Sequence, residues 1–185
     1  MDLKYFTQPT PNPNAVKFIL NRDVKTSGKI SYTSPGQCYN NPLAEALFGI
    51  PEVTQIHFFE NVITVTQNGE AAWEDMEHEV IDLVRGRIAA HDPDFKTGID
   101  ESERRANLPA VVQKIEKILD ETIRPGLQGD GGDLLILEYV EEKKLLRVQY
   151  QGACTTCPSS SLGTLSAIKG ILKEQFDPEI NVVAE

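Results

Sequence analysis

The chain has 185 residues, 40% of them hydrophobic and 25% charged, a composition typical of a globular protein with one domain or two small ones. Its 18 basic and 28 acidic residues give a net charge of −10, which argues against nucleic-acid binding because such proteins normally carry a basic patch. No apolar run approaches the roughly 20 residues that a membrane helix needs, and three cysteines are too few for a disulfide scaffold. We therefore expect a cytoplasmic protein with no nucleic-acid or membrane partner.

Residues 1–96 predict a small α+β domain. The three prolines between Pro9 and Pro13 disfavour a helix there, whereas later segments show the apolar content of strands or the three- and four-residue spacing of amphipathic helices. Strands are expected at 15–20, 29–33, 54–59 and 61–66, the last two as a hairpin about Glu60-Asn61, and helices are expected from Pro42 to Gly49 and over 73–88. The arrangement predicted is one sheet covered by two helices.

Residues 97–107 are polar and charged, and predict a linker, with an extra helical turn as the alternative. Residues 108–185 predict a second domain with the order α-β-β-α-β. Its expected elements are a helix over 108–123, a glycine-rich turn over 128–133, strands over 134–140 and 145–151, a helix that begins near Pro158, and a last strand over 180–183.

The strongest candidate for chemistry is the pair Cys154 and Cys157. Two thiols three positions apart, on a loop that enters a helix, can point the same way. A helix N-terminus favours anions, so we expect a lowered pKa for both thiols. Thiolates are the ligands of soft or borderline metals and of iron–sulfur clusters.

The number of ligands decides how such a centre could be built. Structural zinc and the common iron–sulfur clusters take four protein ligands, and this site offers two. The three histidines, His57, His78 and His91, all lie in the first domain. If the site is metallic, a second copy of the chain supplies the other pair across a twofold axis. A cluster held in this way is exposed at its edge and easily lost, which suits a carrier better than an electron-transfer centre.

Three other interpretations of the pair stay open on the residues alone. The cysteines could be small core residues. They could form a thioredoxin-type redox motif, although no aromatic residue directly precedes Cys154 and the flanking order is ββα rather than βαβ. A zinc ion between two subunits would have the same geometry, and ligand type does not separate zinc from iron. We find no nucleophile elbow, phosphate loop or other catalytic set, so we expect a protein that is not an enzyme.

Two groups of motifs resemble the Nfu family of iron–sulfur cluster carriers. The second domain resembles the family's NifU-like C-terminal domain through Gly129-Asp130-Gly131-Gly132-Asp133 and Gly152-Ala153-Cys154-Thr155-Thr156-Cys157-Pro158-Ser159-Ser160. The first resembles the Nfu N-terminal domain through 9–18, Ser34-Pro35, Pro42-Leu43-Ala44 and 58–66. The resemblance implies a homodimer that binds a [4Fe–4S] cluster between two C-terminal domains, receives it from an upstream donor and passes it to apo-proteins. It leaves open whether a [2Fe–2S] cluster is also carried.

The resemblance implies that Cys154 and Cys157 are the cluster and metal ligands, and it assigns no ligand role to Cys38. Asp130 and Asp133 lack the spacing of a calcium loop, so we expect them to cap or solvate their turn.

His57 is expected to be half-exposed on its strand. For the first domain, which shows no cofactor chemistry, we expect a role in protein interaction or in tuning the site. The start at the N-terminal domain, without a transit segment, favours a bacterial-type cytoplasmic protein, with a mature mitochondrial form as the alternative.

Overall fold

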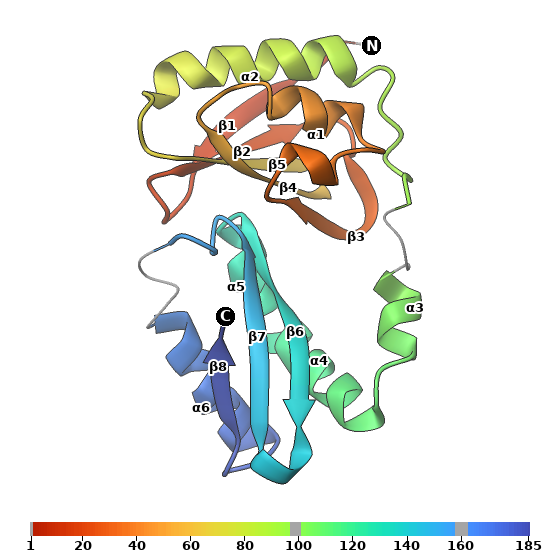
Figure 1. Ribbon diagram of the computed structural model, residues 1–185, viewed down its shortest axis with the longest axis vertical. Helices are drawn as coiled ribbons and strands as arrows, with labels where there is room; N and C mark the ends of the chain where they lie inside the picture. Colours follow the sequence, from red (N-terminus) through yellow and green to blue (C-terminus); the bar gives the residue numbers. More distant parts are fainter. Residues whose placement is uncertain (1, 97–100, 158–162) are drawn as a thin grey trace.

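The computed structural model describes residues 2–96, 101–157 and 163–185, which form two α+β domains (Figure 1). Each domain has its own hydrophobic core. This confirms the predicted fold class. The boundaries expected at 96 and 108 stay predictions.

The N-terminal domain is a five-stranded antiparallel sheet with two helices on one face (Figure 1). The sheet order is β1-β2-β5-β4-β3, from β1 (Tyr5–Pro9), β2 (Ala15–Leu20), β3 (Lys25–Tyr32), β4 (Val53–Glu60) and β5 (Val62–Gln67). The helices are α1 (Pro42–Leu47) and α2 (Trp73–Arg87), and a 3-10 turn, η1, spans Pro35–Gln37. Asn41 caps α1 by accepting a hydrogen bond from the Ala44 amide at 3.1 Å.

Alternation along the central strands gives the sheet two different faces. Phe18, Phe58 and Ile63 are fully buried under the helices. Their strand neighbours, Lys17, His57 and Thr64, point to the opposite face and are also buried, at 6%, 2% and 1% exposure. A polar sheet face that is buried needs a cover, and the second domain provides it (Figure 1).

The C-terminal domain is a three-stranded sheet, β6-β7-β8, packed against helices. β6 and β7 are antiparallel, and β8 is parallel to β7. The elements are α4 (Ala110–Thr122), α5 (Arg124–Gly129), β6 (Gly132–Val140), η2 (Glu141–Lys143), β7 (Leu145–Gly152), α6 (Leu165–Gln175) and β8 (Asn181–Ala184). The predicted α-β-β-α-β order is confirmed, with α5 as an addition.

Three segments differ from the sequence predictions. β1 was not expected. Arg124-Pro125-Gly126, directly after the helix expected over 108–123, begins a further short helix, α5, because a proline fits the first turn of a helix. Part of the predicted linker is helical, α3 (Glu101–Ala106), in line with the alternative of an extra turn. Residues 97–100 of the linker and the expected helix start at 158–162 lie outside the described residues.

A buried charge network connects these parts. The Arg124 guanidinium is 2.5 Å from the Glu116 carboxylate, 2.8 Å from Asp120 and 2.6 Å from Asp133. Lys29 of the first domain reaches the same Asp133 oxygen at 2.6 Å. On the other side, Arg105 of α3 pairs with Asp120 at 2.6 Å, which ties the linker helix to α4.

Replacing the centre of this network should unfold the protein more easily. Arg124→Met removes the buried cation that Glu116 and Asp133 share, so we expect a loss of about 3–5 kcal/mol in the free energy of unfolding. Denaturation in urea measures it. The control Lys117→Met removes an exposed cation 3.9 Å from Glu121, and should change stability by about 0.5 kcal/mol or less. Equal losses of unfolding free energy in the two variants would contradict the role of Arg124 as the centre of the buried network.

Candidate metal centre

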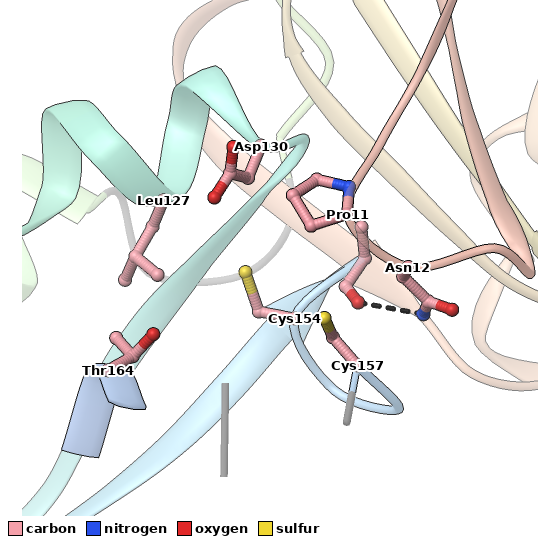
Figure 2. Close-up of a pocket in the computed structure, with 8 residues that line it drawn as sticks. Pro11, Asn12, Leu127, Asp130, Cys154, Cys157 and Thr164 are labelled. Atoms are coloured by element: carbon pink, nitrogen blue, oxygen red, sulfur yellow. Dashed lines mark hydrogen bonds between the residues drawn. The ribbon is translucent and has the colours of Figure 1, made fainter. Parts of the chain in front are cut away.

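Cys154 and Cys157 lie side by side on the loop that follows β7 (Figure 2). Their residues are only 5% and 8% exposed, and both thiols line one small cavity. The second domain contributes Leu127, Asp130, Ala153 and Thr164 to its wall, and the first domain contributes Pro11 and Asn12. The structure therefore brings the two cysteines of the predicted pair together, and their role as ligands stays a prediction.

Glycines position this loop through close contacts between β6 and β7. Gly132 pairs in register with Gly152. A Cβ atom on Gly132 would lie 2.5 Å from the Cys154 sulfur and 2.6 Å from the Gln151 carbonyl oxygen. Gly152 has a φ of +62°, a left-handed backbone that glycine adopts without strain. The two glycine-containing motifs are thus the two sides of one cross-strand contact that holds Cys154.

The environment of Cys154 shifts the pKa of its thiol in the direction opposite to the one expected. Burial, followed by the nearby Asp130, Cys157 and Asp133, raises the pKa of the Cys154 thiol to about 12. The expected lowering of this pKa is wrong, because removal from water disfavours the thiolate. At neutral pH Cys154 therefore carries its proton, which must leave when the sulfur binds a metal.

The described residues contain no group of three or more His, Cys, Asp or Glu side chains that could hold a metal ion. The soft donors at the site are the two thiols. They fit half of a four-ligand zinc or iron–sulfur centre. Cys38 is buried in the core of the first domain, where its thiol donates to the Ser34 carbonyl at 3.7 Å.

Asp133 is fully buried, so of the two expected roles it does not solvate its turn; its carboxylate instead accepts hydrogen bonds from the Gln128 side chain at 3.0 Å and the Leu134 amide at 2.7 Å. Burial acts to raise its pKa, but the charges of Lys29 and Arg124 outweigh burial and hold the pKa below its ordinary value. Asp133 is therefore an ionised anchor between the two domains. Asp130 faces the thiol cavity (Figure 2).

His57 is also buried rather than half-exposed. It lies where the two domains meet, because a Cβ atom on Gly152 would be 3.1 Å from its Cγ. The Nδ1 atom is 2.7 Å from the Ser31 hydroxyl, and Nε2 has no hydrogen-bond partner among the described residues. Burial, partly offset by Asp133 and reinforced by Lys29, lowers the pKa of His57 to about 4. The imidazole is neutral at pH 7.

Comparison with known proteins places both halves of the chain. The family model "Scaffold protein Nfu/NifU N terminal" matches residues 5–91, and the model "NifU-like domain" matches 115–183. The human protein named "NFU1 iron-sulfur cluster scaffold homolog, mitochondrial" is 31% identical over 97% of this chain and 70% of its own length. The chain belongs to the Nfu/NifU-like family.

Other proteins similar to this Nfu/NifU-like chain are matched over different shares of their own length. "NifU-like protein 5, mitochondrial" from Arabidopsis thaliana is 28% identical over 90% of this chain, which spans 62% of that relative. A solution structure of a NifU-like protein from Saccharomyces cerevisiae aligns with a TM-score of 0.44 and 24% identity, over 54% of this chain and 87% of that one. Among the described residues, no helix is both long and apolar enough to cross a membrane.

The contact between Gly132 and the Cys154 sulfur can be tested by adding one methyl group. Gly132→Ala forces the sulfur or the β7 backbone to move, and overpacking of this kind costs about 1–3 kcal/mol of stability. Thermal unfolding should show a lower Tm. The matched control is Gly126→Ala in α5, where a Cβ atom meets nothing within 4 Å. A Tm for Gly132→Ala as high as that of the control would contradict the close contact.

The burial of His57 predicts a titration far from the usual range. NMR should find its pKa at about 4 instead of 6.5. Because the folded pKa is lowered, His57 contributes stability that is complete above about pH 6.5 and declines as the pH falls towards 4. His57→Gln should therefore flatten the pH dependence of unfolding in this window. A measured midpoint near 6.5 would show that the residue is open to water.

Proposed function

We propose that this protein is an iron–sulfur cluster scaffold and carrier, which holds a [4Fe–4S] cluster between two copies of the chain and transfers it to apo-proteins. Cys154 and Cys157 would be the ligands from each copy. The observation that carries the proposal is the pair of thiols in one cavity, held by the Gly132–Gly152 contact, in a chain of the Nfu/NifU-like family. The printed name of the human relative, an iron–sulfur cluster scaffold homolog, supports it.

The ligand count supports a shared cluster. Each chain offers two thiols at the site, and a twofold axis turns two into the four that a [4Fe–4S] cluster takes. Loading and dimer formation are then linked, because each requires the other. The Cys154–Cys157 pairs of the two copies are joined through the cluster, so loss of the cluster releases the chains from each other.

Transfer would proceed by ligand exchange without net redox change. An acceptor's cysteine thiol gives up its proton as its sulfur bonds to iron, and the departing Cys154 or Cys157 sulfur takes up a proton as its own bond to iron breaks. The high pKa of the buried Cys154 thiol favours this reprotonation. The protein supplies ligands and makes no catalytic step, so we propose a carrier and not an enzyme.

The same proposal includes the wider assignments. An N-terminal domain over 1–96, a linker over 97–107 and a cluster domain over 108–185 are consistent with the matched ranges. An upstream cluster donor and apo-protein acceptors would be the partners. We propose a cytoplasmic location, with a mature mitochondrial form as the alternative that the names of the relatives favour.

A thiol–disulfide oxidoreductase is the alternative function for the pair. Such enzymes attack with a thiolate of lowered pKa, whereas burial raises the pKa of Cys154 to about 12. This difference favours the carrier.

Anaerobic reconstitution with iron and sulfide tests the proposal. We expect a brown dimer on size-exclusion chromatography with about four irons and four sulfides per two chains. Cys154→Ala and Cys157→Ala should each lose the cluster, while Cys38→Ala, a matched change in the other domain, should keep it. A fully loaded cluster in either of the first two variants would refute the ligand assignment. A colourless monomer with an oxidisable pair would favour the oxidoreductase, and zinc in the dimer a structural site.

A further inference from the structure

The first domain forms one wall of the cavity that holds the two thiols. Asn12, in the turn between β1 and β2, donates from Nδ2 to the Ala153 carbonyl at 2.9 Å, the dashed line in Figure 2, and to the Thr156 hydroxyl at 2.8 Å. These two acceptors belong to the residues that directly precede Cys154 and Cys157 on the loop. Asn12 is itself only 1% exposed, and Pro11 beside it lines the same cavity. The turn therefore lies directly over the thiol pair.

The space left beneath this turn is too small for a cluster. The cavity has a volume of about 20 Å³, which is room for about one water molecule. Four irons, four sulfides and the cysteine pair of a second chain cannot enter it. The structure is thus a closed arrangement of the two domains.

We propose that the N-terminal domain is a releasable cover of the thiol pair, which must swing away before a cluster, a second copy of the chain or an acceptor can reach Cys154 and Cys157. This inference rests on the proposed carrier function and adds its regulation. The Asn12 turn shields the empty site, and separation of the domains opens it.

The chemistry of the covered surface suits release. Lys17, Thr64, His57 and Ser31 are neighbours in register across β2, β5, β4 and β3, and we call them the docking row. The glycine loop of the second domain lies against it: Lys17 donates to the Gly129 carbonyl, and a Cβ atom on Gly131 would be 3.1 Å from the Thr64 hydroxyl. Polar interfaces between domains of one chain commonly separate, whereas large apolar ones do not.

Part of the docking row is also poorly satisfied in the closed arrangement. Neither His57 Nε2 nor the Thr64 hydroxyl has a hydrogen-bond partner among the described residues. Buried polar groups without partners disfavour the state that buries them. Opening would return both groups to water, which offsets part of the contacts that are lost.

A few polar contacts hold the cover in place. Lys29 pairs with Asp133 at 2.6 Å and donates to the Leu134 carbonyl at 3.0 Å. These contacts, the Asn12 hydrogen bonds and the hydrogen bond from Lys17 to the Gly129 carbonyl are among those that release must break. The linker helix α3 is tied to α4 through Arg105 and Asp120, so it can stay on the second domain while the first domain moves.

The test is the rate at which iodoacetamide alkylates each cysteine of the full-length, reduced, metal-free protein, followed by peptide mass spectrometry. Asn12→Ala and Lys29→Met should each raise the rates at Cys154 and Cys157 by about tenfold or more, because opening limits access. Cys38, buried in the core of the first domain, is the internal control and should not change. Lys29→Arg should restore slow alkylation.

A matched variant controls for the loss of a positive charge. Arg85→Met removes an exposed cation on α2, 3.6 Å from Asp82, on the sheet face away from the docking row, and should alkylate like the unmodified sequence. Unchanged rates at Cys154 and Cys157 in both Asn12→Ala and Lys29→Met would overturn the cover. So would an equal acceleration at Cys38, which would mean general unfolding.

Alkylation needs neither iron nor sulfide, so it separates this inference from the proposed function. If the variants expose the thiols but no protein loads a cluster, the carrier function fails and the cover stands. If the unmodified protein loads a cluster while the variants expose nothing, the cover fails and the carrier stands. If the cover and the carrier function both hold, Asn12→Ala and Lys29→Met should also take up the cluster faster in anaerobic reconstitution.

Discussion

The ionised Asp133 is the constraint on which the arrangement of this molecule depends. A carboxylate with no exposed surface must be paired with cations, and Asp133 takes one from each domain, Arg124 and Lys29. Arg124 is in turn fixed by Glu116 of α4 and Asp120. One buried charge thereby determines where α4, α5, β6 and β3 meet. Because Asp133 adjoins Gly132, the same junction sets the position of the loop that carries the thiols.

The packing between the two domains therefore determines access to the thiols. The contacts that hold the first domain against the docking row also place Asn12 over Cys154 and Cys157. A cargo that binds only the open arrangement shifts the protein towards it by mass action. If the cover opens as proposed, every contact that stabilises closure lowers the affinity for cluster by the same free energy.

The sequence predicted what local patterns control and failed where distant parts meet. The amphipathic helices and the 53–67 hairpin follow from periodicity, whereas β1 was missed because its residues are exposed or half-buried and show no alternation. The Cys154–Cys157 pair is a local motif and could be found. His57 packs against Gly152 and Asp133 pairs with Lys29, and both contacts join residues far apart in the chain. The raised pKa of Cys154 comes from burial, which no local pattern predicts. No local pattern announces that Asn12 covers a loop 141 residues later.

Burial and closure together suit a site that must be empty part of the time. Two exposed thiolates would bind adventitious metal and oxidise to a disulfide, since both reactions need the deprotonated sulfur. Burial keeps Cys154 protonated, and the cavity leaves room for about one water. Binding of a cluster then costs the free energy of deprotonating Cys154 and of separating the two domains. The same free energy is regained when the cluster leaves. The empty protein is protected by the same features that make release of the cargo favourable, so weak net binding is what this architecture predicts for a carrier.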